Sequence, residues 1–151
     1  MARSLRTRAF QAWWRLRRPL TLGVRGVVVD GEGRVLLVRH TYVSGWHFPG
    51  GGVEKAETAA AAIARELVEE AGIYLVEPAR LVSIHANHAV FPNDHVLLYR
   101  ADRWTQGEAT SRGEIAETGF FHPKDPPPGV SGGTARRLAE LFAGAAPSGD
   151  W

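Results

Sequence analysis

Three acidic side chains, those of Glu66, Glu69 and Glu70, are spaced so that together they could bind a divalent cation. An α-helix turns by about 100° per residue, so the three carboxylates would fall within an arc of about 100° on one side of a helix. In water, like charges three and four residues apart destabilise a helix by about 0.2 to 0.5 kcal/mol per pair. A bound cation would offset this repulsion. The simpler alternative is an acidic helix face in contact with solvent.

The positive charge within this segment is too small to balance the acids. Arg65 is one counter-ion, and a single guanidinium cannot neutralise the three glutamates together with Glu57. The chain has no cysteine, so a metal ion would have oxygen or imidazole ligands. Oxygen ligands favour Mg²⁺, with Mn²⁺ as the alternative, and Mg²⁺ is commonly held by a few carboxylates together with water and substrate phosphates.

Three consecutive glycines, Gly50, Gly51 and Gly52, precede the acidic segment. Glycine has no Cβ and reaches positive φ without strain, so this run lets the backbone bend tightly and approach a metal ion or a phosphate. A merely flexible turn would not explain why the bend leads to the acidic segment.

The glutamates are expected on a helix over residues 58–71. Thr58 is typical of an N-cap, and Gly72 is typical of the residue that ends a helix in a left-handed conformation. The alanines between them favour a helix without help from packing. Ile63 and Leu67 fall on the adjoining arc, so we expect one face of the helix to be buried and its edge to be acidic.

The remaining pattern indicates a mixed α/β fold. Apolar runs at 24–30 and 34–41 flank a Gly-rich turn and predict a β-hairpin. Further strands are expected within 45–52, 81–90, 95–104 and 117–123. Thr134 is expected to open a C-terminal helix that ends near residue 143, and the segment APSGDW after it is expected to be loose.

Composition and length fit one ordinary soluble domain, since the 151 residues are 44% hydrophobic and 23% charged. No apolar run approaches the roughly 18 residues that span a bilayer, and the N-terminus lacks the apolar block of a secretory signal. We therefore expect a cytoplasmic protein with two parts, a basic N-terminal arm or helix over 1–20 and a main domain over 21–151.

Charge is distributed unevenly along the chain. Six of the 18 basic residues lie within residues 1–18, where there is no acid, so the remaining 12 face 16 acids. The arginines alternate with apolar residues up to Pro19, as in a basic amphipathic helix. Contact with a membrane surface is open to such a helix, but we favour an arm packed on the domain with its arginines in water. Nucleic acid is a disfavoured partner because the main domain is net negative.

The residues from Gly51 to Ile73 resemble the signature of the Nudix hydrolase family without a departure. Gly51 is followed after five residues by Glu57, and after seven more by the run RELVEEAGI, which starts at Arg65. The order of the expected elements also resembles that family over about residues 21–143. The resemblance implies an α/β/α sandwich with a mixed β-sheet and a loop-helix-loop that carries the signature.

The resemblance also implies a function, which is the metal-dependent hydrolysis of a nucleoside diphosphate linked to another group X. Carried over by position, the metal ligands would be Glu66, Glu69 and Glu70, with the Gly50 carbonyl as a further ligand. Arg65 and Glu57 would support them. A nucleotide-binding module without catalysis and an RNA 5′-pyrophosphohydrolase are the alternatives. The expected partner is a small nucleotide-type substrate, and a homodimer is left open.

The general base and the substrate contacts are less sharply defined by the sequence. Glu70, Glu114, Glu117 and His88 are the candidates for the base, and Glu114 ranks next after Glu70 because Glu70 is first of all an expected metal ligand. For substrate binding we name Arg39, Trp46, Phe48, Gly51 and Gly52, with His40, Tyr42, Phe91 and Tyr99 as weaker candidates. Aromatic rings among them could stack on a base.

Overall fold

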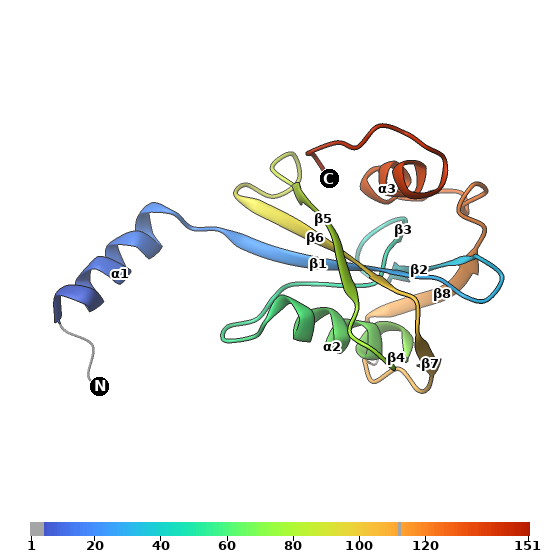
Figure 1. Cartoon of the computed structure of the whole chain (residues 1–151), viewed down its shortest axis with the longest axis horizontal. Helices are drawn as coiled ribbons and strands as arrows, with labels where there is room; N and C mark the ends of the chain where they lie inside the picture. Colours follow the sequence, from blue (N-terminus) through green and yellow to red (C-terminus); the bar gives the residue numbers. More distant parts are fainter. Residues whose placement is uncertain (1–4, 112) are drawn as a thin grey trace.

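A computed structural model describes residues 5–111 and 113–151, and these form a layered α/β/α arrangement (Figure 1). Helix α2, Ala59–Ala71, and helix α3, Gly132–Phe142, lie on opposite sides of the strands. The predicted α/β/α sandwich with mixed strand pairing is thus confirmed. Helix α3 begins two residues before the expected start, because Ser131 is its N-cap and its hydroxyl accepts a hydrogen bond from the Thr134 N–H.

One sheet has the strand order β1-β6-β5, and the glycine run pairs with the outer edge of β1. Its members are β1, Thr21–Val28, β6, Asp94–Ala101, and β5, Arg80–Ala86. Strand β1 pairs in parallel with β6 along its whole length, and β5 is antiparallel to β6. Strands in parallel pairs are commonly buried on both faces, and the three valines of β1, Val24, Val27 and Val28, are fully buried.

A second sheet has the order β3-β2-β8 and is antiparallel. It contains β3, Trp46–His47, β2, Val35–His40, and β8, Ile115–Phe121. The expected hairpin between β1 and β2 is therefore only partly right. The two strands meet at the isolated bridge between Val29 and Val35 and then enter different sheets, because each is paired along its length with another strand.

A short pair of strands, β4, Ile73–Leu75, and β7, Trp104–Gln106, was not expected from the sequence. It follows α2 directly, since Gly72 ends the helix at φ 64° as predicted. The Gly107 N–H donates to the Gly72 carbonyl oxygen at 2.8 Å, so the chain after β7 is fixed near the C-terminal end of α2.

Two groups of buried side chains lie on the two faces of the strands. The group under α2 includes Ile63, Leu67 and Val24, and the group under α3 includes Leu138, Phe48 and Leu98. Gly26 lets β1 approach α2 closely, because a Cβ there would lie 2.9 Å from Cδ2 of Leu67. The sheet is therefore a firm support for α2 and for the loop that precedes it.

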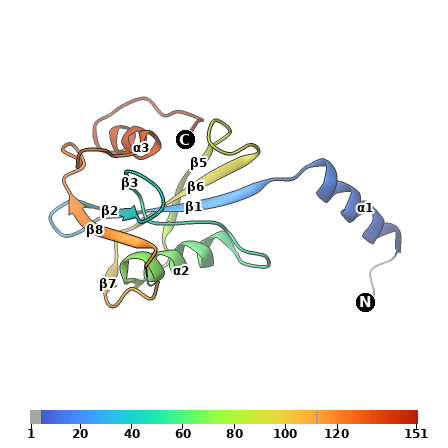
Figure 2. The same cartoon turned by 180° about the vertical axis from the view of Figure 1, so that it is seen from behind.

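Helix α1, Leu5–Arg17, stands apart from the layers (Figures 1 and 2). Its Phe10, Trp13 and Leu16 side chains are exposed, so the expected packing on the domain is wrong for these residues. Pro19 and Leu20 carry the chain from the end of the helix into β1 without folding it back. No helix in the described part of the chain is long and apolar enough to cross a membrane.

The C-terminal segment is not loose as expected. The Ala86 N–H donates to the Gly149 carbonyl and the Trp151 N–H donates to the Ala86 carbonyl, both at 2.8 Å, so Gly149–Trp151 lies parallel to the end of β5. Both views place this end of the chain between α3 and the ends of β5 and β6 (Figures 1 and 2).

Candidate active site

The glutamates lie on α2 where the sequence predicted them, and the helix is fixed at both ends. The Thr58 hydroxyl accepts a hydrogen bond from the Ala61 N–H at 3.1 Å, which caps the first turn. Ile63 and Leu67 are buried against the sheet and set the rotation of the helix about its axis. As a result Glu70 and Glu66 lie against Gly50 and Gly51, and Glu69 lies on the same edge of the helix, beside the cavity that Glu114 lines.

The glycine run packs between β1 and α2. The Val24 N–H donates to the Gly51 carbonyl at 2.8 Å, which ties the loop to β1. Gly50 has φ 143°, and a Cβ at this position would lie 2.0 Å from the Val24 carbonyl oxygen. A Cβ at Gly51 would lie 2.4 Å from Oε1 of Glu66. Gly50 thus has the positive φ expected of the run, whereas at Gly51 a Cβ would displace the Glu66 carboxylate.

Arg65 holds three of the acids in place. Its Nε and Nη2 donate to the two carboxylate oxygens of Glu57 at 2.9 and 3.1 Å, and its Nη1 donates to Glu66 at 2.9 Å and to Glu69 at 3.1 Å. The hydrogen bonds from Arg65 lower the pKa of the Glu57 carboxyl, and those same bonds to Glu57 raise the pKa of Arg65. Arg65 is therefore a positioning residue for these carboxylates.

Arg25 on β1 belongs to the site and was not predicted. Its Nη1 donates to the carbonyl oxygens of Phe48 and Gly50, at 3.0 and 2.8 Å. Burial lowers the pKa of Arg25, and the charges of Glu70 and Glu66 act in the opposite direction. A single arginine in the apolar run VRGVVVD was the available signal, because a charge in a buried strand needs a local partner.

Glu70 is the buried member of the acidic group and has two hydrogen-bond partners. Its Oε2 accepts from the Gly50 N–H at 2.8 Å, and its Oε1 lies 2.7 Å from Nε2 of His40 at the end of β2. A carboxylate only accepts, so Nε2 of His40 carries the proton. His40, a weak candidate for substrate contact, is thus a partner of Glu70.

Glu114 lies next to Glu69 across a small cavity. The cavity has a volume of about 260 Å³ and is lined by Glu69, Thr110, Ser111 and Glu114. The Ser111 N–H donates to the Glu69 carbonyl at 2.9 Å, which attaches this loop to the last turn of α2. The loop was expected to bring an acid to the site from a distant part of the chain; Glu114 shares a cavity with Glu69, and its role as the base stays a prediction.

The other candidates for the base lie in different surroundings. Glu117 is paired with Arg39 at 2.8 Å across β2 and β8. His88 lies in the exposed turn between β5 and β6, where its ring packs edge-on against His95 at 5.2 Å between centroids. Neither side chain contacts the three glutamates through a hydrogen bond found in the described residues.

The predicted substrate residues separate into two groups. Gly51 and Gly52 line a groove beside the acidic edge, which also contains Phe91. Phe48 is fully buried and Trp46 is nearly so, with its ring against Phe121. Side chains in these two positions pack the core and offer little face to a ligand. Arg39 donates from Nη2 to the Glu117 carboxylate, and its guanidinium lies 5.9 Å from the Trp46 ring centroid.

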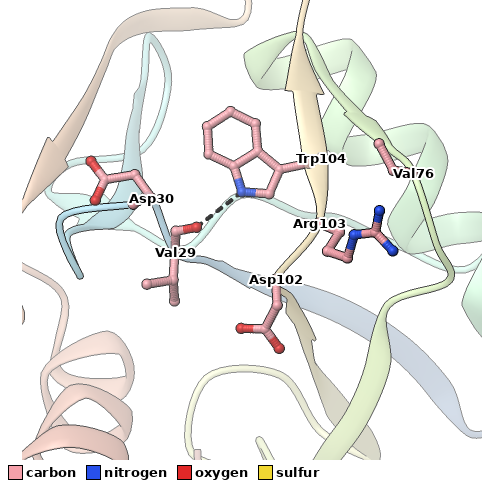
Figure 3. A pocket seen from close by; sticks show the side chains of 7 residues that line it. Val29, Asp30, Val76, Asp102, Arg103 and Trp104 are labelled. Carbon is pink, nitrogen blue, oxygen red and sulfur yellow. Dashed lines mark hydrogen bonds between the residues drawn. The ribbon is translucent and has the colours of Figure 1, made fainter.

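The pocket in Figure 3 contains none of these residues. It has a volume of about 430 Å³ and lies where β1 ends and β6 passes into β7, between Val29, Asp30 and Arg103. Trp104 closes one side by donating from Nε1 to the Val29 carbonyl at 3.0 Å. Its two acids, Asp30 and Asp102, are paired with Arg34 and Arg100, so the glycine run and α2 remain the candidate active site.

The donor set at α2 suits a hard divalent cation. Burial raises the pKa of the Glu66 carboxyl, and the charges of Glu70 and Glu69 raise it further against the effect of Arg65. Residues 5–111 and 113–151 contain no three acidic or histidine side chains that already converge as a metal cage. The glutamates instead bond to Arg65, His40 and Gly50. The available ligands are all oxygens, from the glutamate carboxylates and the Gly50 carbonyl. The residues therefore fit Mg²⁺ or Mn²⁺.

Comparison with known proteins agrees with this geometry. A sequence model of the NUDIX domain matches residues 19–142. A MutT-like protein of Streptomyces ambofaciens is 40% identical over 67 residues, which cover 44% of this chain and 43% of that protein. An RNA pyrophosphohydrolase of Halorhodospira halophila is 47% identical over 47 residues, 31% of this chain and 26% of that protein.

A solved structure covers more of the chain. The crystal structure of a MutT NUDIX hydrolase from Burkholderia pseudomallei superposes with a TM-score of 0.69 at 27% identity, over 81% of this chain and 98% of that one. The matched segment spans less than half the length of each of the two relatives above.

Proposed function

The chain belongs to the Nudix family, and from this premise we propose that it is a metal-dependent pyrophosphohydrolase. Its substrate is a nucleoside diphosphate linked to another group, such as a nucleoside triphosphate or a nucleotide sugar, and water attacks phosphorus. The observation that supports this most strongly is the contact of Glu66 and Glu70 with the glycine run, with Glu69 on the same edge of α2 and bonded to Arg65. That arrangement places an anionic edge beside a backbone that a diphosphate can approach.

Glu66, Glu69 and Glu70, with the Gly50 carbonyl, would hold Mg²⁺ or Mn²⁺. When bound, such a cation neutralises charge on the diphosphate and lowers the pKa of a coordinated water. Two of these ligand carboxylates are already held by hydrogen bonds, that of Glu66 by Arg65 and that of Glu70 by His40. Glycine at 51 leaves the Glu66 carboxylate free of a Cβ clash.

The remaining residues have separate tasks. Arg65 keeps Glu57, Glu66 and Glu69 in rotamers that face the loop, and Arg25 supports the loop from below through the Gly50 carbonyl. Glu114 is our choice for the general base, since it shares a cavity with Glu69 and has water access. The chain contains no cysteine nucleophile, and direct attack by water needs none.

The proposal is tested by incubating the full chain with Mg²⁺ and a panel of nucleoside di- and triphosphates, nucleotide sugars and 5′-triphosphate RNA. We expect release of nucleoside monophosphate, phosphate or pyrophosphate from at least one small nucleotide, and loss of this release in Glu69→Gln. Binding of nucleotides with no turnover across the panel would instead support a binding module. Turnover of RNA alone would favour the RNA 5′-pyrophosphohydrolase.

A further inference from the structure

A groove continues from the acidic edge toward the C-terminal segment. Its volume is about 390 Å³. At one end are Gly51, Gly52 and Arg25, which contact the glutamates or their loop, and at the other end are Phe91 and Trp151. A nucleotide whose phosphates lie at the glycine run would therefore extend its base toward two aromatic side chains.

The residues that line the groove with Phe91 and Trp151 include polar side chains that form hydrogen bonds. Asp94 at the start of β6 accepts from the Thr21 hydroxyl at 2.7 Å and from the Asn87 side-chain amide at 2.9 Å. These bonds fix the Asn87 amide and leave its carbonyl oxygen and second amide proton to meet a ligand. A heterocyclic base can stack on an aromatic side chain and form hydrogen bonds with the Asn87 amide through its polar edge. A sugar ring fits these two kinds of contact less well.

Trp151 is held in position by the segment that carries it. The buried Arg137 donates from Nη1 to the Asp150 carbonyl at 2.8 Å and from Nη2 to Glu140 at 2.6 Å. The same Glu140 oxygen accepts from the Ser148 N–H at 2.9 Å. Together with the backbone pairing to Ala86, these contacts anchor four consecutive residues to α3 and β5.

The indole ring itself is packed on its inner side. Its centroid lies 5.8 Å from that of His85, in an edge-to-face arrangement, and 5.6 Å from Cζ of Arg137. Gly133 provides the space for the ring, because a Cβ there would lie 2.3 Å from Nε1 of Trp151. With the inner side packed, the part that remains accessible faces the groove.

We propose that the docked segment Ser148–Trp151 completes a binding site for the base of the nucleotide, with Trp151 and Phe91 as its aromatic walls. Arg137 and His85 are positioning residues that act through Trp151. This inference rests on the proposed function, because it takes the phosphates to lie at the glycine run. The ligand class is an aromatic heterocycle attached to a sugar phosphate.

The test compares Trp151→Leu, which keeps an apolar side chain, with Trp151→Phe, which keeps an aromatic one. Loss of base stacking raises KM for the best nucleotide about 5- to 100-fold in Trp151→Leu and changes kcat little. Trp151→Phe stays within about threefold of the wild-type KM. Arg137→Met, which releases the segment with Trp151 intact, shows the same rise in KM as Trp151→Leu. Trp13→Leu, on the distant helix α1, is the matched control and leaves KM unchanged.

A binding measurement separates this inference from the proposed function. Nucleoside without phosphate is titrated into metal-free wild type and Trp151→Leu, and the chemical shifts of the backbone amides of Gly52 and Asn87, which line the groove in both proteins, are followed by NMR. Weak binding at the groove that is lost in the variant supports the site even if no nucleotide is hydrolysed. If nucleotides are hydrolysed but Trp151→Leu keeps the wild-type KM and nucleoside affinity, the base site is refuted and the proposed function stands.

Discussion

Nε2 of His40 lies 2.7 Å from Oε1 of Glu70, and both side chains are buried. The contact joins the end of β2 to the last turn of α2. It fixes one oxygen of a carboxylate whose other oxygen accepts from the Gly50 N–H. One histidine thus determines how the buried glutamate is presented to the loop.

Replacing His40 with alanine should therefore affect both stability and activity. Glu70 would lose one of its two partners inside the protein, which costs about 1 to 3 kcal/mol of unfolding free energy. Because its carboxylate would no longer be oriented, kcat should fall about 10- to 100-fold. Urea unfolding and steady-state kinetics measure the two effects, with the exposed His88→Ala as control. A variant with wild-type kcat would show that the contact does not orient Glu70 for catalysis.

Two glycines allow a matched test of the space beside Glu66. In Gly51→Ala the new Cβ meets the Glu66 carboxylate at 2.4 Å, whereas nothing lies within 4 Å of a Cβ at Gly31. A side chain can move aside, so we expect Gly51→Ala to lose at least about 10-fold in kcat with little change in unfolding free energy. Gly31→Ala should leave both unchanged. Equal kinetics in the two variants would remove the steric argument for glycine at 51.

The effect of metal is best examined at Glu69, whose carboxylate is the most exposed of the three. Glu69→Gln removes repulsion from Glu66, so in EDTA the melting temperature should hold or rise. Mg²⁺ should raise the melting temperature of the wild type, because binding to the folded state alone stabilises it, and should raise that of the variant less. Activity should fall at least about 100-fold. An identical Mg²⁺ response in both proteins would exclude Glu69 as a ligand.

The buried His85 should make the unfolding free energy depend on pH. Burial lowers its pKa from the ordinary value of 6.5, and the neighbouring charge of Arg137 lowers it further. Since the pKa is lower in the folded state, the unfolded chain takes up the proton first as the pH falls. The stabilisation is therefore complete well above pH 6.5 and is lost as the pH falls through 6.5 toward the folded pKa.

Urea unfolding between pH 7.5 and 5 measures this effect. The unfolding free energy of the wild type should decrease on acidification more steeply than that of His85→Asn, which retains a polar side chain without the titration. His88→Asn, in the exposed turn, should follow the wild type. Parallel curves for His85→Asn and wild type would show that another group causes the loss.

The local parts of this site were predictable because they depend on spacing. Thr58, Gly72 and the three glutamates act within one helix, and the glycine run adjoins it, so sequence neighbours are also neighbours in space. The residue patterns indicated a mixed α/β fold, and the α/β/α layers were expected from the resemblance to the Nudix family. The glutamates were expected at an open edge, however, and the burial of Glu70 was not foreseen.

The parts that were missed depend on contacts between distant residues. His40 contacts Glu70, which lies 30 residues later in the sequence, and His85 contacts Ser148, which lies 63 residues later. Strand pairing also decides that β1 and β2 part into different sheets, which the Gly-rich turn alone cannot indicate. A polar segment such as APSGDW is expected to be loose unless a distant strand end and a buried arginine offer it partners, as Ala86 and Arg137 do here.

Arg65 offers the sharpest test of how the acids are held. Its planar guanidinium donates in parallel to both oxygens of Glu57 while Nη1 serves Glu66 and Glu69, a geometry that a lysine ammonium cannot reproduce. Arg65→Lys keeps the charge, so any loss reports geometry, and we expect kcat to fall about 10- to 100-fold with a smaller change in melting temperature. Arg80→Lys, at an exposed strand end, is the control and should match the wild type. If Arg65→Lys retains full kcat, charge alone suffices, and the orientation of Glu66 and Glu69 by a fork of hydrogen bonds is not what catalysis requires.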